Sequence, residues 1–243
     1  MSALEFQAQV LIIGAGGIGS PAALSLVLSG IERLALADGD KVELSNLHRQ
    51  ILFNNDDIGR PKLEAFCDAL RRRSPSIQLY CHPGRLLPHS IADAVAGADV
   101  ILDATDNFAS RFLIADAAYL GSKPVIHAAS VRWQATVMAV SAQGRPCYRC
   151  LFEDLPRENA PDCASAGVAG PVCGVAGSIA ADRVLSVLAG QSQRFGSMTT
   201  FDGLRDRLRE VRLKARLDCE LCGSKSTIRS LDARRYMAQA CEM

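Results

Sequence analysis

The chain has 243 residues, a formal net charge of +1, and 49% hydrophobic residues. This length fits one domain of ordinary size, or a domain with a small appendage, and the apolar fraction is too high for global disorder. The near balance of 27 Lys and Arg against 26 Asp and Glu gives no support to a nucleic-acid scaffold or a polybasic membrane protein.

The beginning of the chain lacks positive charge, since no Lys or Arg precedes Arg33. A secretory signal peptide starts with cations, so we do not expect one here. No charge of either sign lies between Glu5 and Glu32, a stretch long enough to span a bilayer. Because this stretch contains several glycines, a proline and serines, a strand, a glycine turn and a buried helix explain it better than a membrane helix.

The hydrophobic pattern predicts alternating strands and helices up to residue 140. Strands are expected at 8–13, 33–37, 77–82, 98–104, 124–130 and 135–140, and helices at 20–29, 61–73, 90–96 and 108–120. Ser20 is expected to cap the first helix, with Pro21 at its first position. This alternation predicts an α/β fold with a Rossmann-like, doubly wound, mostly parallel sheet that is covered by helices on both faces.

The pattern changes after residue 141. A cysteine pair leads into a polar stretch at 153–163, a Gly/Ala-rich helical stretch extends to about Leu188, and strand-like runs follow at 198–202 and 208–217. We therefore expect a first half at 1–141, a second part of the same domain at 142–222, and a peripheral tail at 223–243.

A glycine-rich loop, GAGGIGS, follows the first predicted strand and opens a predicted helix. In that context loop backbone approaches a phosphate closely, and helix N–H groups face the anion. Asp38 ends the next strand, where a carboxylate accepts hydrogen bonds from ribose hydroxyls. These features alone predict an NAD-dependent dehydrogenase, while glycines that serve only strand–helix packing are the structural alternative. The glycines of the loop are Gly14, Gly16, Gly17 and Gly19.

The residues after the second strand favour a triphosphate over a nicotinamide ring. DGDKVELSNLHRQILF at 38–53 supplies carboxylates, an amide and a planar cation, and GRPK at 59–62 adds a lysine at a helix start. Arg and Lys neutralise phosphate oxygens and a carboxylate holds Mg²⁺, so ATP with Mg²⁺ fits this set. The candidates are Asp38, Asp40, Asn46, Arg49 and Lys62.

Asp106 lies just after a later predicted strand, in DATDNFASR at 103–111. Its position suits a Mg²⁺ ligand. Capping of the following helix is the alternative role for this carboxylate, and the residue by itself does not separate the two.

The motifs GAGGIGS, DGDxVxxSNLxRQ, GRPK and DxTDN, in this order, resemble the ThiF/MoeB/HesA family of bacterial relatives of ubiquitin-activating enzymes, and the ThiF branch above all. The resemblance extends from about Val10 to Cys222. It implies an adenylyltransferase that uses ATP and Mg²⁺ to activate the C-terminal Gly-Gly carboxylate of a small ubiquitin-like sulfur carrier. A ThiS- or MoaD-like carrier, a separate sulfur donor, thiamine or molybdopterin biosynthesis, and a homodimer are implied in the same way.

The resemblance also implies roles by motif position. Gly17 would approach the phosphates, Asp38 would bind the ribose, and Asp106 would coordinate Mg²⁺. The residues expected around the triphosphate are Asn46, Arg49 and Lys62, and Ser45 and Asn107 lie in the same motifs and are expected in the nucleotide site. Residues 1–141 thus become the ATP-binding half, and 142–222 the crossover loop, zinc knuckles and carrier-binding part.

Nine cysteines are an odd number in a long chain, which makes a poor disulfide framework. Four of them form the pairs Cys147-x-x-Cys150 and Cys219-x-x-Cys222, with 68 residues between the pairs. Two such knuckles predict a structural, tetrahedral Cys₄ zinc site that clamps distant segments together, and two redox motifs are the alternative. The family resemblance implies the same zinc site. Metal-binding thiols indicate a reducing compartment, and we expect the cytoplasm.

Cys163 precedes a predicted helix in NAPDCASAGVAGP at 159–171. A helix N-terminus lowers the pKa of a thiol and activates it. The resemblance implies a catalytic role, with a covalent acyl-disulfide link to the carrier, beside Arg49 and Asp106 in the nucleotide site. An exposed cysteine without a role is the alternative. Trp133 and Phe152 either line a channel for the carrier tail or pack, and we favour packing for Trp133.

The sequence departs from the family at its start. Many relatives carry an N-terminal segment whose arginine reaches the ATP of the partner subunit. Here nine residues precede Val10, and none is a cation. A truncated start, a substituting cation, or weakened adenylation would each account for this, and an arginine on phosphate charge is worth about 10³-fold or more. An inactive carrier-binding relative is therefore the second functional hypothesis.

Overall fold

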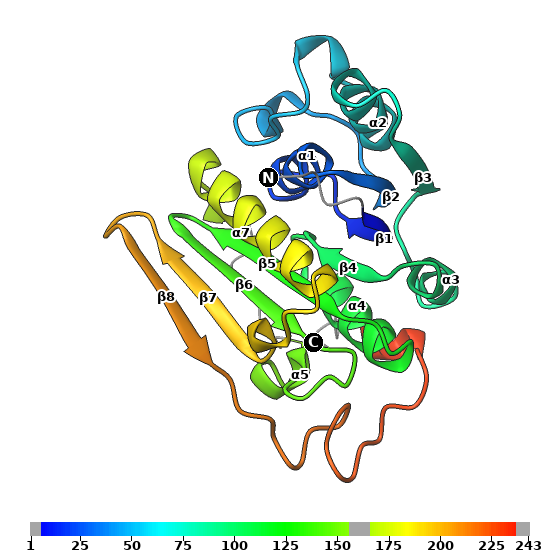
Figure 1. Cartoon of the computed structure of the whole chain (residues 1–243), viewed down its shortest axis with the longest axis vertical. Coiled ribbons are helices and arrows are strands. Elements are labelled where there is room, and N and C mark those ends of the chain that lie inside the picture. Colours follow the sequence, from blue (N-terminus) through cyan, green and yellow to red (C-terminus); the bar gives the residue numbers. More distant parts are fainter. Residues whose placement is uncertain (1–5, 156–165, 237–243) are drawn as a thin grey trace, which may run out of the picture.

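The computed structural model describes residues 6–155 and 166–236 and has one eight-stranded sheet with helices on both faces (Figure 1). The strands lie in the order β3-β2-β1-β4-β5-β6-β7-β8. Their bounds are β1 Phe6–Ile13, β2 Ile31–Asp38, β3 Gln78–Pro83, β4 Val100–Asp103, β5 Val125–Val131, β6 Gln134–Val140, β7 Ser197–Asp202 and β8 Arg207–Arg212. Strands β3, β2, β1, β4 and β5 pair in parallel, and β5 to β8 pair antiparallel.

The helices follow the predicted order closely. They are α1 Gly19–Leu28, α2 Lys62–Arg73, α3 Ile91–Ala96, α4 Phe108–Leu120, α5 Tyr148–Leu151 and α7 Gly170–Leu188, with short 3-10 helices η1 Leu44–Asn46, η2 Asn55–Asp57, η3 Ser192–Arg194 and η4 Ala233–Tyr236. The predicted fold class is therefore confirmed. The division at residue 141 stays a prediction, and β7 and β8 from the second part extend the same sheet.

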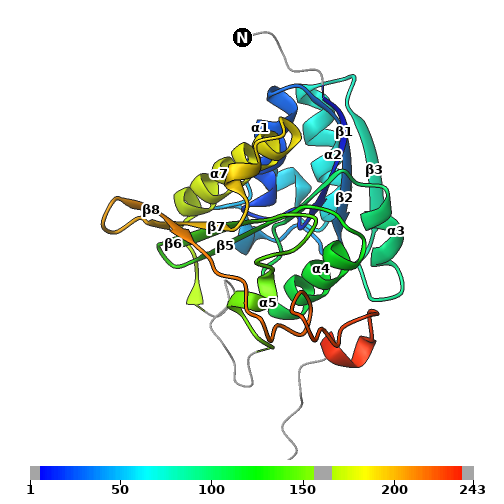
Figure 2. The ribbon, with the colours of Figure 1, turned by 60° about the horizontal axis from the view of Figure 1, so that its bottom comes forward.

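The core is split into two layers because successive residues of a strand point to opposite faces of the sheet. Val10 and Ile12 of β1 pack in the layer that contains α1, α2 and α7, whereas Leu11 and Ile13 pack in the layer that contains α3 and α4. Figure 2 shows α1 and α7 on one side of the sheet and α4 on the other. The continuous apolar runs of the parallel strands are explained by this burial on both faces.

Helix α7 is long and apolar enough to cross a membrane by length and composition, and it is the one such helix among the described residues. Half of its apolar window is buried inside the molecule, where it packs against α1, β5 and β6. The contact with α1 requires glycine at position 177, since a Cβ there would lie 2.7 Å from the carbonyl oxygen of Ile18. These contacts identify α7 as a core helix of the sheet.

Two local predictions were wrong. Ser20 does not cap α1, because Ile18 holds the N-cap position and the Ser20 hydroxyl is fully buried without a hydrogen-bond partner in the described residues. Helix α1 begins one residue before Ser20, so Pro21 is its third residue. The last strand ends at Arg212, although the alternating pattern predicted a run to Leu217. Every residue of β8 is exposed, so no buried face extends the strand.

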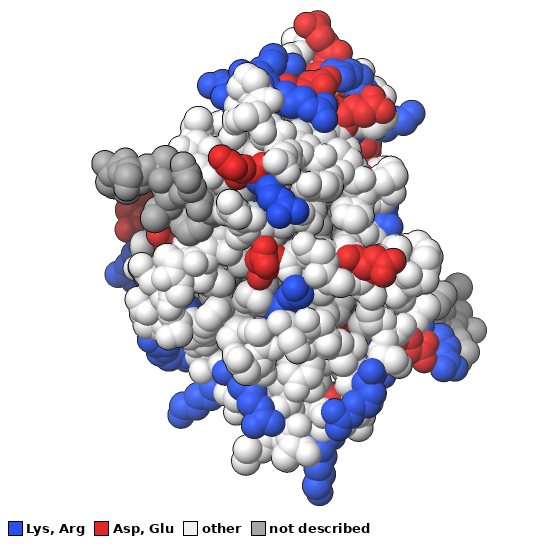
Figure 3. All heavy atoms as spheres, turned by 45° about the vertical axis from the view of Figure 1, so that its right-hand side comes forward, with Lys and Arg blue, Asp and Glu red and all other residues white. Residues whose placement is uncertain are grey.

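The surface around α2 carries charges of both signs. Arg60 bridges Asp57 of η2, at 2.7 Å, and Asp68 of α2, at 2.6 Å. Figure 3 shows acidic and basic side chains interspersed over that end of the molecule. This mixture agrees with the small net charge of the chain.

A buried ion pair joins α4 to the segment of the first cysteine knuckle. Arg149 donates from Nε and Nη2 to the two carboxylate oxygens of Asp116, at 2.8 and 2.9 Å. Both side chains are almost completely buried. Tyr236 of η4 donates a further hydrogen bond to Asp116 at 2.8 Å, which ties the end of the described chain to the same carboxylate.

We expect Asp116→Asn to lower the free energy of unfolding by about 3 kcal/mol, because it leaves the buried Arg149 without its counter-charge. Urea denaturation followed by circular dichroism measures this. Asp154→Asn is the matched control, since Asp154 is 78% exposed and lies 3.9 Å from the same guanidinium. If the two substitutions lowered the free energy of unfolding equally, the stabilising role of the Arg149–Asp116 pair would be contradicted.

Candidate functional site

A cavity of about 680 Å³ opens at the carboxyl ends of the parallel strands. Loops after β1, β2 and β4 and residues of β5 line it, and its volume is typical of sites for small ligands. Ten of the twelve predicted nucleotide-site residues lie in its wall: Gly14, Gly16, Gly17, Asp38, Asp40, Asn46, Arg49, Lys62, Asp106 and Asn107. The other two, Gly19 and Ser45, do not line the cavity.

The glycine loop places backbone where side chains would collide. Gly14 has a φ of +102°, and a Cβ there would lie 2.7 Å from the carbonyl oxygen of Ala104. Gly19 is the first residue of α1, and a Cβ there would strike the carbonyl oxygen of Gly14. Gly19 therefore acts by close packing beneath the loop. The glycine loop and the residue that precedes α1 thus lie against the cavity, an arrangement that suits an anion.

Asp38 orders the loop from the neighbouring strand. One carboxylate oxygen accepts the N–H of Ala15 at 2.8 Å, and the other accepts the N–H of Asp40 at 2.8 Å. This carboxylate therefore holds the glycine loop and the turn after β2 together. Nearby, the Lys62 ammonium pairs with Asp40 at 2.9 Å and is 8% exposed. It stands at the start of α2 as a mostly buried cation in the cavity wall.

Arg49 is oriented by the loop that follows β2. Its Nη2 donates to Oδ1 of Asn46 at 2.6 Å, and its Nη1 donates to the carbonyl oxygen of Ser45 at 3.4 Å. Ser45 does not line the cavity itself, and its hydroxyl donates to Glu43 at 3.2 Å. Glu43 lines the cavity and was missed at the sequence level, where its only signal was its place in the DGDxVxxSNLxRQ motif.

Asn107, and not Asp106, has the helix-capping role that was one of the two alternatives for Asp106. The side chain of Asn107 is the N-cap of α4 and accepts the N–H of Ser110 at 2.9 Å. Asp106 is exposed in the cavity wall, and its one hydrogen bond among the described residues comes from Nδ2 of Asn107 at 3.5 Å. The carboxylate is therefore free to take a ligand.

Sequence reasoning missed a cluster of buried polar groups beside the cavity. Nδ1 of His127 lies 2.7 Å from Oδ2 of Asp103, and Nη1 of Arg111 lies 3.6 Å from the same oxygen. Burial raises the pKa of Asp103, but the charge of Arg111 and the hydrogen bond of His127 outweigh it and hold the pKa below its usual value. No sequence signal marked His127, which lies in an otherwise apolar strand.

Aromatic and sulfur side chains complete the wall. Phe152 lines the cavity, as one of its two predicted roles requires, and Tyr148 lines it too. Trp133 is 46% exposed and lies outside the lining, so the packing role that we favoured for it was wrong. Cys173 of α7 is buried at the glycine loop, where a Cβ on Gly17 would lie 3.2 Å from its sulfur.

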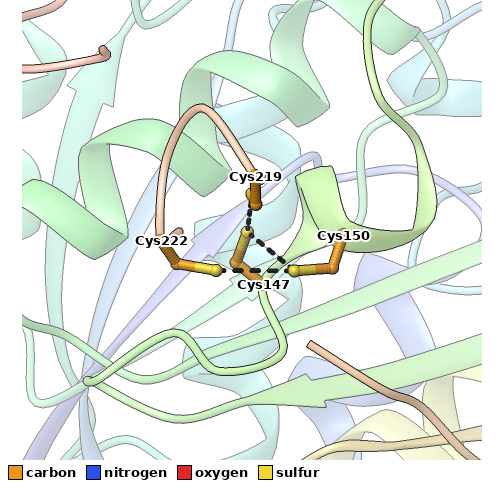
Figure 4. Close-up of side chains that lie close together, drawn as sticks. All are labelled: Cys147, Cys150, Cys219 and Cys222. Carbon is orange, nitrogen blue, oxygen red and sulfur yellow. Dashed lines mark hydrogen bonds between the residues drawn. The ribbon is translucent and has the colours of Figure 1, made fainter. Parts of the chain in front are cut away.

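The four paired cysteines come together as predicted (Figure 4). Cys147 lies 3.8 Å from Cys150 and 3.5 Å from Cys219, and Cys150 lies 3.4 Å from Cys222, between sulfur atoms. A tetrahedral Zn²⁺ with bonds of 2.3 Å requires about 3.8 Å between sulfurs. The donor set and its spacing therefore fit one zinc ion. Hydrogen bonds from Cys147 and from the other two cysteines lower the pKa of Cys222 to about 5.

Backbone contacts hold the two knuckles in place. Arg145 donates to the carbonyl oxygen of Cys222 at 2.8 Å, and the N–H of Arg216 donates to the sulfur of Cys150 at 3.4 Å. The cluster joins the segment after β6 to the segment after β8. Cys163, the predicted covalent residue, lies outside the described residues, so its role stays a prediction.

The fold and the cavity have the organisation of α/β proteins that bind a nucleotide beside a glycine loop, here with a Cys₄ cluster at one end of the sheet. The chain matches the ThiF family over residues 3–222 and belongs to that family, which confirms the resemblance.

Two curated relatives illustrate the match. The sulfur carrier protein ThiS adenylyltransferase of Escherichia coli (strain K12) is 42% identical over 221 residues, which are 90% of this chain and 87% of the relative. The adenylyltransferase and sulfurtransferase MOCS3 of Mus musculus is 39% identical over 227 residues, which are 92% of this chain and 49% of the relative. The chain thus spans about half the length of the MOCS3 relatives.

Among solved structures, that of E. coli MccB with ATP superposes with a TM-score of 0.78 at 24% identity. The match covers 89% of this chain and 66% of that chain. SeMet PaaA superposes with a TM-score of 0.72 at 24% identity, over 86% of this chain and 65% of that chain. At this identity the two likenesses establish a shared fold.

We expect Cys219→Ser to remove the metal, because a tetrahedral site with three thiolates loses most of its affinity for zinc. Elemental analysis of purified protein should fall from roughly one zinc per chain to near zero, with a lower melting temperature. Cys81→Ser is the control, since Cys81 is exposed and outside the cluster. An unchanged zinc content in Cys219→Ser would refute the Cys₄ assignment.

Proposed function

We propose that this protein is an ATP-dependent adenylyltransferase that activates the C-terminal Gly-Gly carboxylate of a small ubiquitin-like sulfur carrier. The family and the names of the relatives support this activity, above all the ThiS adenylyltransferase, whose length the chain nearly covers. We propose a ThiS- or MoaD-like carrier, and thiamine or molybdopterin biosynthesis as the pathway.

The observation that carries the proposal is the charge pattern of one cavity wall. A glycine loop at a helix N-terminus, a ribose-side carboxylate, two cations and an acidic residue with no ion-pair partner among the described residues meet there. A nicotinamide ring needs no such cations, whereas the phosphates of ATP do. The residues in question are Asp38, Arg49, Lys62 and Asp106.

The chemistry follows from these positions. The carrier carboxylate attacks the α-phosphate in line, the bond to the β-phosphate breaks, and an acyl-adenylate and pyrophosphate result. The step needs positioning and charge neutralisation more than a general base. The start of α1 and the side chains of Arg49 and Lys62 neutralise phosphate oxygens, and Lys62 exchanges Asp40 for phosphate. Asp106 would hold Mg²⁺, which supplies further neutralisation of the leaving pyrophosphate.

The remaining partners belong to the same proposal. We propose that sulfur comes from a separate donor protein, that the enzyme works as a homodimer, and that it works in the reducing cytoplasm, where the cysteine cluster keeps its metal. Lys41, Arg85 and Arg111 also line the cavity, so it contains cations other than Arg49 and Lys62.

The purified protein should exchange labelled pyrophosphate into ATP only when a carrier ending in Gly-Gly is present. ATP, and not NAD, should raise the melting temperature, because only the ligand that binds the native state stabilises it. Carriers truncated by the last glycine are the control. Tight carrier binding with no adenylate by mass spectrometry would favour an inactive carrier-binding relative, and no exchange with any carrier would refute the proposal.

Asp106→Asn should lower kcat/KM of the exchange about 100-fold or more, because an amide cannot neutralise Mg²⁺ and holds it weakly. The defect should lessen as the Mg²⁺ concentration rises. Asp93→Asn is the control, since that carboxylate is exposed on α3 outside the cavity wall. If the two variants behave alike, Asp106 is not the metal ligand.

A further inference from the structure

One buried polar atom beside the cavity has no partner. Nε2 of His127 is shielded from solvent and makes no hydrogen bond in the described part of the chain. The other ring nitrogen, Nδ1, lies 2.7 Å from Asp103. His127 lines the cavity and Asp103 does not, and the ring edge that carries Nε2 is the one turned away from Asp103. An unpaired buried nitrogen costs free energy unless a ligand supplies the missing bond.

The hydrogen-bonding role of Nε2 follows from its neighbours. Asp103 is ionised, because Arg111 and His127 hold its pKa down against burial, and a carboxylate only accepts. Nδ1 therefore donates its hydrogen to Asp103. A neutral imidazole carries one ring hydrogen, so with that hydrogen on Nδ1 the other ring nitrogen has a free lone pair. In that tautomer Nε2 is an acceptor, and it requires an N–H or O–H donor.

The side chains beside the His127 ring are thioethers and aromatic rings. His127 pairs with Met138 of β6, which pairs with Met198 of β7, so the three side chains lie in one row on one face of the sheet. The ring of Tyr148 lies 4.6 Å from the imidazole, and the ring of Phe152 lies 4.8 Å from that of Tyr148. All five residues line the cavity. They form a lobe that excludes water from a hydrogen bond to Nε2.

This lobe lies away from the ribose side of the cavity. Asp38 ends β2, on one side of the glycine loop after β1, whereas His127 is on β5, two strands beyond β1 on the other side. At the usual strand spacing β2 and β5 are about 14 Å apart. A nucleotide whose ribose is at Asp38 and whose phosphates are at the glycine loop leaves the lobe to the group that attacks the α-phosphate.

We propose that Nε2 of His127 accepts a hydrogen bond from a backbone N–H of the C-terminal peptide of the acyl substrate, and thereby selects an extended peptide in this lobe. The inference rests on the proposed function. A Gly-Gly terminus has no side chains, so its recognition depends on backbone groups, and its N–H groups are the donors it offers. Asp103 is the positioning residue, since it fixes the tautomer and the ring orientation.

Two substitutions of His127 test the acceptor at Nε2 separately from the hydrogen bond between Nδ1 and Asp103. In His127→Asn the side-chain amide stands near the place of Nδ1, so it keeps a donor for Asp103 and removes the acceptor. In His127→Gln the amide reaches the place of Nε2 and restores an acceptor there. His82→Asn is the matched control, because His82 lies in the same row of the sheet, on β3, outside the cavity wall.

The experiment pairs these variants with semisynthetic carriers in which one of the last three peptide bonds is an ester, so that one N–H is absent. In the wild type and in His82→Asn, one of the esters should raise KM for the carrier about 3- to 10-fold in pyrophosphate exchange. In His127→Asn, KM for the all-amide carrier should already be raised by the same factor. Replacing the amide by the ester should then raise this KM by less than about 2-fold more. His127→Gln should regain the sensitivity to the ester, and KM for ATP should stay unchanged in all variants.

The outcomes distinguish this inference from the function on which it rests. The proposed role of His127 would be overturned if the ester had the same effect in the wild type and in His127→Asn. It would also be overturned if the substitution raised KM for ATP as much as KM for the carrier. Neither outcome would affect the proposed function. Absence of exchange by the wild type with every all-amide carrier would overturn the proposed function and this inference with it.

Discussion

The parallel pairing of β1, β2, β4 and β5 is the constraint on which the cavity depends. Parallel strands end at the same edge of a sheet, so the loops that follow them meet there although they are far apart in sequence. The glycine loop, Asp38 and Asp106 each follow one of these strands and share one cavity wall. The hydrogen bonds that the Asp38 carboxylate accepts from the N–H groups of Ala15 and Asp40 then hold two of these loops in a fixed relation.

The antiparallel half of the sheet adds a second wall to the same cavity. Helix α5, which begins after Cys147, contributes Tyr148 to that wall, and the segment on which α5 lies is held by the cysteine cluster and by the Arg149–Asp116 pair. The cysteine cluster and the buried ion pair thus act on the shape of the site without touching a ligand. This coupling gives a physical reason for a Cys₄ cluster in a protein whose proposed chemistry makes no use of it.

Buried charge is concentrated where the parallel and antiparallel parts meet. Asp103, Arg111 and His127 lie on neighbouring elements, and each alone would be costly in the interior. Together they pair as an ionic cluster, and Nε2 of His127 is the one fully buried polar atom of these three side chains without a hydrogen-bond partner in the described residues. A cluster whose one unpaired atom belongs to a residue of the cavity wall is suited to bind a ligand. The Asp116 carboxylate differs, because both of its oxygens are paired with Arg149.

Much of this organisation was predictable from local signals, because alternating apolar runs, glycine turns and acidic strand ends are short-range patterns. They determined the fold class, the order of ten strands and helices up to residue 140, and ten residues of the cavity wall. Hydrophobic spacing does not encode a partner distant in sequence. The tertiary structure alone therefore decided that Asn107 caps α4 and leaves Asp106 free, that β8 stops at Arg212, and that a histidine in an apolar strand meets Asp103 across a strand pair. The four cysteines were recognisable by spacing, but only folding brought both pairs within bonding distance of one metal ion.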